Sequence, residues 1–511
     1  MGEKDEDQGP FARLAGWFDN RLGLSHPFLR PAPTYAISPF YWLGALAVVA
    51  FVIQAVTGML MMLYYVPDPS PSVGSTVPQA YATTQYIFQN VSYGRFLETV
   101  HLYTAYAMIM LAFMHMMRGY FVSVHKKPRE IMWITGMAMG FVTLGLGFTG
   151  YLLPWTVVSK SATDVGTGMI SALPQPLSTF LTFLVVGGGG DTATLLRFFD
   201  LHVVVLPAIL LVLLVVKMYM LEAHGISEPV TGPEQLPEEK KRIIPIFPTV
   251  SFYLVELAAL FGSAMLLISA VFPLNLPPVY SAATAGQYTA QPDWYFLWIY
   301  QVLKISAFES NGPLSTYGLP VALTLVTLVF IVLLVLPFID RGETRRIDRR
   351  PVFVALGAVL VSEISVLTVW GYLTPGRAIP DEQAALVLGG TALAVVIITL
   401  MTYKLFFGKV AGRLRTGAVP SEPKERKAAM WVAAALVFLL GLGTLATGST
   451  VNSFVGMLSG GATAWSLLGF VASAAVLTLA AFLTILLLYR LDLGNGAVRK
   501  RIRALEAGWR E

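Results

Sequence analysis

The feature that most constrains this chain is a series of apolar runs, each roughly 20 residues long. A helix rises ~1.5 Å per residue, so a run of this length crosses a hydrocarbon core ~30 Å thick. The runs lack the strict apolar–polar alternation of barrel strands, and we therefore predict an all-α integral membrane protein. The ten predicted spans are 41–65, 97–120, 132–153, 198–221, 247–272, 317–339, 351–373, 383–405, 429–447 and 465–489.

Charged residues are scarce and unevenly placed. They make up 13% of the chain, about half of the roughly one quarter that soluble domains carry. Lys and Arg gather in alternate connections, which the positive-inside rule assigns to the cytoplasm. We therefore expect a multi-pass protein of a prokaryotic cell membrane with both termini cytoplasmic. The basic segments are 125–129, 240–242, 341–350, 404–427 and 499–503.

The chain contains no cysteine. Disulfides, thiolate-held iron–sulfur clusters and thioether-attached haem are therefore excluded from this chain. Any haem must be held by other side chains, and any iron–sulfur centre must belong to another subunit.

Three of the six histidines lie within predicted spans. A lone histidine in a membrane helix is often a hydrogen-bonded packing residue, but ionisable groups in lipid also mark functional sites. His101 and His115 are 14 residues apart, which returns to within ~40° of one helix face after a rise of ~21 Å. His202 lies at the depth of His101 on another span. This spacing suits two haems stacked across the bilayer between facing helices.

Lys217 lies 15 residues after His202, at the depth of His115. It follows an uninterrupted apolar run, where a charge is unexpected. The lysine could extend its ammonium to the inner surface, or its neutral amine could coordinate iron. Both interpretations stay open.

Two pairs of glycines repeat the 14-residue period of the histidines. Gly44 and Gly58 lie in the first span, and Gly136 and Gly150 in the third. Small residues can serve helix packing alone. The shared period instead favours glycines that leave room for flat, bulky ligands.

With these residues the chain resembles the cytochrome b subunit of the quinol:cytochrome c oxidoreductase (cytochrome bc and bf) family, over roughly residues 35–405. The resemblance implies a cytochrome b-type bundle with two haems inside its first four helices. Further motifs that carry it are Arg118, Lys126–Glu130, Gly150–Trp155, Arg197–His202 and Pro292–Tyr295.

The resemblance implies that His101 and His202 ligate the outer haem iron. His115 and residue 217 would ligate the inner haem iron, where family members have histidine and this chain has Lys217. Either Lys217 is the ligand, or the inner haem has one protein ligand, or the inner haem is absent. We favour ligation by Lys217. Haem-pocket positions carried over are Gly44, Gly58, Arg118, Gly136 and Gly150. The haems are expected to be b-type or a related variant.

The segment Pro292-Asp293-Trp294-Tyr295 resembles the Pro-Glu-Trp-Tyr motif of the quinol oxidation site. It lies in 273–316, one of three long outer connections, a length typical of functional loops. We expect Asp293 and Tyr295 to be catalytic, with Pro292 and Trp294 binding quinol. Pro154 and Trp155 are expected to bind it too. The aspartate form is similar to variants associated with menaquinol.

Three positions depart from the family pattern: Glu98, Asp200 and Glu222. Asp200 stands two residues before His202, where a small residue is common. Glu98 stands where an arginine usually meets the haem propionates, and Arg95 is a possible substitute. At the inner quinone site Glu222 stands where some members have histidine, with His224 two residues later. Both are candidates for that site.

The implied function is oxidation of quinol at the outer face with a Rieske iron–sulfur partner. Electrons would cross through two haems to an inner quinone site, coupled to proton translocation as in a Q cycle. The expected partners are the Rieske protein, a cytochrome c-like or oxidase acceptor, a second copy in a homodimer and membrane lipid, with no nucleic acid. A dihaem dehydrogenase anchor would lack the Pro-Asp-Trp-Tyr loop, and a transporter or channel would contain no haem.

We divide the chain into four parts on this basis. They are a cytoplasmic segment (1–40), the haem-binding four-helix bundle (41–225), a C-terminal cytochrome b region with the quinol-site loop (226–410), and two extra helices with a basic tail (411–511).

Overall fold

The computed structural model describes residues 17, 21, 32–33, 39–187, 190–227, 243–244, 250–285, 291–305 and 318–403. Within these ranges, eight helices are long and apolar enough to cross a membrane, which confirms the first eight predicted spans. The spans predicted at 429–447 and 465–489 lie outside the described residues. The eight are α2 (Leu43–Met62), α4 (Gly94–Phe121), α5 (Glu130–Leu152), a continuous helix from α8 to α9 (Gly190–His224), α10 (Ser251–Val271), α13 (Gly318–Ile339), α14 (Pro351–Leu373) and α15 (Asp381–Thr402).

Large apolar side chains point outward on the long helices. Val212 of α9 is 62% exposed and Leu260 of α10 is 69% exposed. In water such surfaces would be unfavourable, whereas lipid tails solvate them. The exposed apolar faces therefore agree with an all-α, multi-pass membrane protein.

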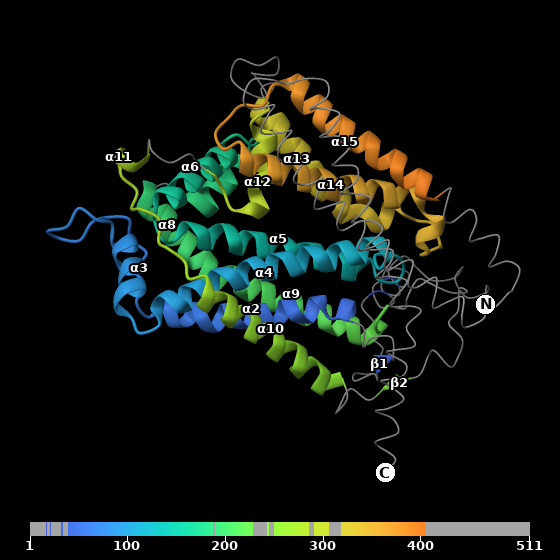
Figure 1. Cartoon of the computed structure of the whole chain (residues 1–511), viewed down its shortest axis with the longest axis horizontal. Helices are drawn as coiled ribbons and strands as arrows, with labels where there is room; N and C mark the ends of the chain where they lie inside the picture. Colours follow the sequence, from blue (N-terminus) through green and yellow to red (C-terminus); the bar gives the residue numbers. More distant parts are fainter. Residues whose placement is uncertain are drawn as a thin grey trace, which may run out of the picture. The chain divides into compact units, whose positions relative to one another are not determined.

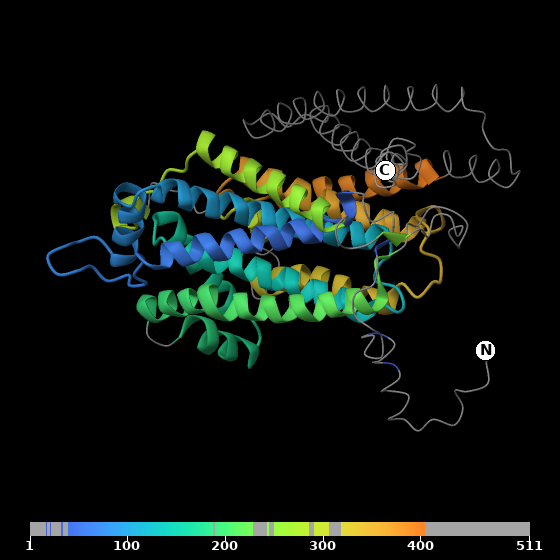
Figure 2. The same cartoon turned by 90° about the horizontal axis from the view of Figure 1, so that it is seen from below.

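Four helices form the bundle that carries the candidate haem ligands. Helix α2 packs along α4, α5 packs along α9, and α4 packs against α5, so that they run side by side in both views (Figures 1 and 2). Helix α10 covers α2 and α4, while α13 covers α5.

The fourth bundle helix is interrupted near its outer end. It begins as α8 (Gly190–Asp200), passes through a π-helical turn η4 (Leu201–Val205), and continues as α9 (Leu206–His224). A π turn places one extra residue in the helix and often marks a functional site. His202 lies inside this turn.

The long outer connections contain short helices. These are α3 (Gln79–Asn90), α6 (Val157–Ser171), α7 (Leu177–Leu181) with the π turn η3 (Thr182–Val186), α11 (Ala282–Ala285) and α12 (Trp294–Leu303). Thr156 caps α6 by accepting a hydrogen bond from the Ser159 amide at 3.2 Å. The connections are therefore ordered where the structure describes them. A two-residue antiparallel pair, β1 (Ala32–Pro33) with β2 (Ile243–Ile244), joins the N-terminal segment to the chain before α10.

The chain divides into two compact units, residues 1–345 with 368–378 and residues 346–367 with 379–511. In the described part of the second unit, the Tyr403 hydroxyl donates to the Ile347 carbonyl. All candidate site residues belong to the first unit.

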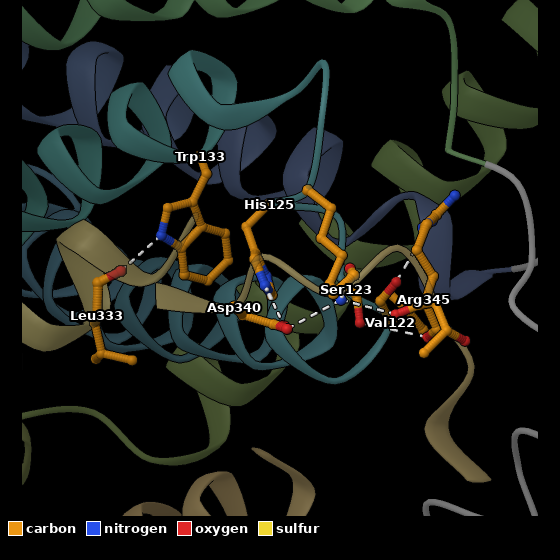
Figure 3. Close-up of polar contacts among 10 residues, drawn as sticks. Val122, Ser123, His125, Trp133, Leu333, Asp340 and Arg345 are labelled. Atoms are coloured by element: carbon orange, nitrogen blue, oxygen red, sulfur yellow. Dashed lines mark hydrogen bonds and ion pairs between the residues drawn. The ribbon is translucent and has the colours of Figure 1, made fainter. Parts of the chain in front are cut away.

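A buried polar cluster joins two connections at the basic ends of the bundle helices (Figure 3). Asp340, which follows α13, lies 3.0 Å from His125 Nε2 and 3.0 Å from Lys126 Nζ. The Trp133 indole donates to the Leu333 carbonyl at 2.7 Å. Buried charges are tolerated only when they are paired, so this cluster fixes α4, α5 and α13 relative to one another.

Candidate functional site

The outer pair of histidines meets in the middle of the bundle. The rings of His101 on α4 and His202 on η4 have centroids 6.2 Å apart, and their planes make an angle of 67°. Both residues are partly buried. The structure thus brings together the two histidines predicted to share the outer haem.

Hydrogen bonds determine which nitrogen of each outer histidine carries its proton. His202 Nδ1 lies 3.1 Å from the Leu146 carbonyl oxygen, which can only accept, so Nδ1 is the protonated nitrogen. The Thr57 hydroxyl gives its proton to the Ile53 carbonyl at 2.7 Å, so its oxygen accepts from His101 Nδ1 at 2.8 Å. In both residues Nε2 keeps its lone pair, which is the state that a metal ligand requires.

The inner level holds His115 on α4 and Lys217 on α9. His115 Nδ1 is buried and has no hydrogen-bond partner among the described residues. Lys217 is half-buried and lies close enough to His115 for its charge to act on the imidazole. The lysine amine therefore stays inside the bundle at the level of His115.

The π turn explains the spacing between His202 and Lys217. Fifteen α-helical residues would rotate the second side chain by ~60° from the first, whereas 14 give ~40° in the opposite sense. Because η4 takes up one extra residue, Lys217 keeps the direction expected of a 14-residue spacing. The α9 pair therefore matches the 14-residue separation of His101 and His115.

Each candidate ligand faces a glycine of a neighbouring helix. A Cβ at Gly58 would lie 3.4 Å from His101 Cε1, and one at Gly44 would lie 3.1 Å from His115 Cε1. A Cβ at Gly150 would lie 2.4 Å from His202 Cε1.

The fourth glycine repeats this arrangement at the lysine. A Cβ at Gly136 would lie 2.7 Å from Lys217 Nζ. The predicted glycines thus keep side-chain atoms away from all four positions. Together with the free lone pairs and the unpartnered His115 Nδ1, this arrangement fits two flat haem groups at two depths.

Arg118 lies one helical turn after His115, toward the inner end of α4. Its guanidinium stacks over the Tyr41 ring with 3.9 Å between Cζ and the ring centroid. The position is consistent with the predicted haem-pocket role.

The outer loop places Asp293 at the start of α12. Its Oδ1 accepts a hydrogen bond from the Tyr106 hydroxyl at 2.8 Å, and its Oδ2 accepts one from Tyr295 at 3.2 Å. Burial raises the pKa of Asp293 above its ordinary value, and the two phenol hydrogen bonds oppose that rise. Burial, together with the Asp293 charge, also raises the pKa of Tyr295.

Tyr295, which donates to this carboxylate, packs against helix α5 and against Trp294. Gly147 of α5 leaves space for the Tyr295 hydroxyl, which a Cβ there would approach to 3.0 Å. Trp294, beside Tyr295, packs edge-on against it with centroids 5.6 Å apart. Pro292 immediately precedes Asp293 in the same loop.

The predicted quinol-binding residues Pro154 and Trp155 follow the end of α5. Trp155 is 3% exposed and packs with Ala80 and Leu195. Its φ of +51° is unusual for a bulky residue. Pro154 lies between this residue and the end of α5. The next residues, Thr156 and Val157, pair with the segment before α11, which ties this turn to the loop that leads to Asp293.

The inner quinone candidates lie at the last turn of α9. His224 Nε2 donates to the Arg21 carbonyl, and the His224 carbonyl accepts from Arg129 at 3.1 Å. Arg21 also pairs with Glu130 at 3.2 Å. Glu222 lies on the same turn. The N-terminal segment therefore contacts the predicted inner site.

The structure also places Glu98, one of the departures from the family pattern, and its possible substitute Arg95. Arg95 donates to the Leu274 carbonyl at 2.6 Å and to the Asn275 amide oxygen at 2.8 Å. It therefore binds the chain after α10. Glu98 is buried one turn before His101.

Sequence reasoning missed the residues that support the predicted ones. Thr57 and Thr149 contact the outer histidines, the latter 3.3 Å from His202 Nδ1. The repeated Thr-Gly pairs at 57–58 and 149–150 could have indicated them. Tyr106 lies 187 positions from Asp293, and no local pattern indicates that contact.

Comparisons with known proteins agree with the fold. Residues 106–281 match the family model "Cytochrome b(N-terminal)/b6/petB", and residues 288–385 match "Cytochrome b(C-terminal)/b6/petD". The chain is 32% identical over 365 residues to a cytochrome bc complex cytochrome b subunit of Chlorobaculum thiosulfatiphilum, covering 70% of this chain and 80% of the relative. It is 29% identical over 460 residues to a cytochrome b of Sulfolobus acidocaldarius, covering 85% and 78%. A solved structure titled "Hyperthermophilic respiratory Complex III" matches with a TM-score of 0.55 at 25% identity, covering 77% of this chain and 95% of that one.

Proposed function

The chain belongs to the cytochrome b family, and from that premise we propose that it is the dihaem subunit that oxidises quinol in a bc-type respiratory complex. The single observation that carries the proposal is the matched set of ligands and glycines. Four candidate ligands lie at two depths of one bundle, and each faces a glycine on a neighbouring helix.

For the outer haem we assign His101 and His202 as axial ligands. They come from facing helices. His101 Nδ1 donates a hydrogen bond to the Thr57 hydroxyl oxygen, and His202 Nδ1 donates one to the Leu146 carbonyl. Such contacts fix the ring orientation of a metal-binding histidine. Gly58 and Gly150 provide the clearance beside them.

For the inner haem we assign His115 and Lys217. The lysine replaces the histidine expected from the family, and its amine lies beside Gly136, which has no side chain. In its neutral form the lysine amine has a lone pair that can coordinate iron. When bound, the two haems supply one-electron carriers at two depths of the membrane.

At the outer face Asp293 acts as the proton acceptor for quinol. Burial raises its pKa, which makes it a stronger base than an exposed aspartate and so a better proton acceptor. Tyr295 holds one carboxylate oxygen, while Pro292, Trp294, Pro154 and Trp155 shape the quinol pocket. The aspartate variant of the motif favours menaquinol as the substrate.

The remaining parts of the proposal concern the inner face and the partners. Glu222 and His224 bind a quinone at the cytoplasmic end of α9 and supply its protons. A Rieske iron–sulfur protein and a cytochrome c-like or oxidase acceptor take electrons at the outer face. The complex is a homodimer that translocates protons across the cell membrane, and both termini of this chain are cytoplasmic.

Reduced-minus-oxidised spectra of the purified complex test the proposal. We expect two b-type haems per chain, with His101→Ala and His202→Ala each losing the same one. His115→Ala should lose the other haem, so the three variants control one another. Absence of any haem band would refute the proposal and favour a transporter. A single haem would retain the family but contradict the transmembrane electron route.

A further inference from the structure

The carboxylate of Asp293 is turned away from the helix that it begins. Asp293 is the N-cap residue of α12, a position where aspartate normally accepts a hydrogen bond from the first-turn amides. Its side chain makes no such capping bond. Both oxygens instead accept phenol hydrogens, so tertiary contacts override the local preference.

The shorter of the two phenol bonds comes from Tyr106 of α4. The distance from the Tyr106 hydroxyl to Asp293 Oδ1 is 2.8 Å, against 3.2 Å for Tyr295 and Oδ2. Tyr106 lies five residues after His101, which places it ~7.5 Å further along the helix axis toward the inner face. The bond therefore draws the carboxylate toward the interior of the bundle.

The surroundings of the carboxylate are phenolic. The rings of Tyr106 and Tyr295 meet edge to face with centroids 6.2 Å apart. Tyr151 of α5 is close enough for the Asp293 charge to act on it. Among the described residues, the side-chain hydrogen bonds to Asp293 come from Tyr106 and Tyr295. Two neutral donors therefore stabilise the ionised carboxylate and oppose the rise in its pKa that burial causes.

We propose that Tyr106 is a positioning residue for quinol oxidation, which holds the Asp293 carboxylate toward the bundle in the ionised form that accepts a quinol proton. The inference rests on the proposed role of Asp293. Oxidation of one quinol to quinone releases two protons and two electrons. Asp293 accepts one of these protons, the second is released to the water at the outer face, and the two electrons leave to the redox partners named above.

The short side chain of Asp293 explains why a contact with Tyr106 would matter. Aspartate is one methylene shorter than the glutamate of the usual motif, so its carboxylate reaches less far from the loop. A tyrosine on α4 extends from the bundle to meet it. Tyr106 and Asp293 should therefore behave as a coupled pair.

The test is the pH dependence of menadiol oxidation by membranes that contain the assembled complex. Below the pKa of Asp293 the carboxyl is already protonated and cannot accept a proton, so the rate falls on the acidic side. Tyr106→Phe removes a donor that stabilises the ionised form. The acidic limb, the pH range over which the rate falls on the acidic side, should then move to higher pH by about one unit. At pH values below the limb this is a tenfold loss of rate.

Tyr103→Phe is the matched control. Tyr103 lies on the same helix, and its hydroxyl donates to the Phe272 carbonyl at 2.8 Å, away from Asp293. This variant should leave the acidic limb in place. An unmoved limb in Tyr106→Phe, or an equal shift in Tyr103→Phe, would overturn the inference.

A double variant separates this inference from the proposed function. With Asp293→Asn no carboxylate remains, so adding Tyr106→Phe should cause no further shift of the profile. An additional shift in the double variant would contradict the pairing. Full activity of Asp293→Asn alone would refute the proton-accepting role itself. A slow Asp293→Asn with an unshifted Tyr106→Phe would refute only the positioning role. Haem content of each variant reports whether the complex has assembled.

Discussion

Substitution of Gly150 by alanine tests the haem-binding interpretation most directly. The new Cβ would lie 2.4 Å from His202 Cε1, 2.9 Å from Nδ1 and 3.0 Å from Nε2. Ordinary contacts begin near 3.4 Å, so the imidazole must withdraw by about 1 Å. Binding geometry generally has to be held to within ~0.5 Å. We therefore expect Gly150→Ala to lose the outer haem or to change its ligation.

The fold itself should tolerate this substitution. Alanine favours a helix over glycine by ~0.5–1 kcal/mol, which helps α5. Displacing His202 weakens its bond to the Leu146 carbonyl, a loss of ~1 kcal/mol. The two effects nearly cancel, so loss of haem should occur without loss of the protein.

The assay is haem stoichiometry with reduced-minus-oxidised spectra of the purified complex. Gly140→Ala, on the same helix, is the matched control, because a Cβ there meets no atom within 4 Å. Gly58→Ala should have a mild effect, since its Cβ would lie 3.4 Å from His101 Cε1. Two haems with unchanged spectra in Gly150→Ala would refute the reasoning, as would equal haem loss in Gly140→Ala.

Three further predictions concern other parts of the bundle. Lys217→Met should change the spectrum of the inner haem and leave that of the outer haem unchanged, whereas Lys217→His should retain an inner haem. An unchanged inner-haem spectrum in Lys217→Met would mean that the amine does not ligate iron. Thr57→Val removes the acceptor for His101 Nδ1, and a redox titration should show a shifted potential for the outer haem alone. Asp340→Ala leaves His125 and Lys126 without their buried partner and should lower stability by ~3 kcal/mol, measured by thermal unfolding in detergent; an unchanged midpoint would contradict the anchoring role.

The membrane bundle and the two depths of the candidate ligands could be predicted from the sequence alone. Both depend on local periodicity, because run length and residue spacing translate into helix length and rise. The eight spans within the described residues were found this way. The 14-residue repeats also placed His101, His115 and the four glycines at matching depths, before any tertiary contact was known.

The tertiary structure decided which side chains meet. The glycine opposite each ligand, the protonated nitrogen of His202 and the π turn that realigns Lys217 all depend on how separate helices pack. The contact between Tyr106 and Asp293 joins positions 187 residues apart and replaces the capping bond that aspartate normally makes. Periodicity describes one helix at a time, whereas the environment of a buried carboxylate is set by neighbours that the chain reaches only after folding.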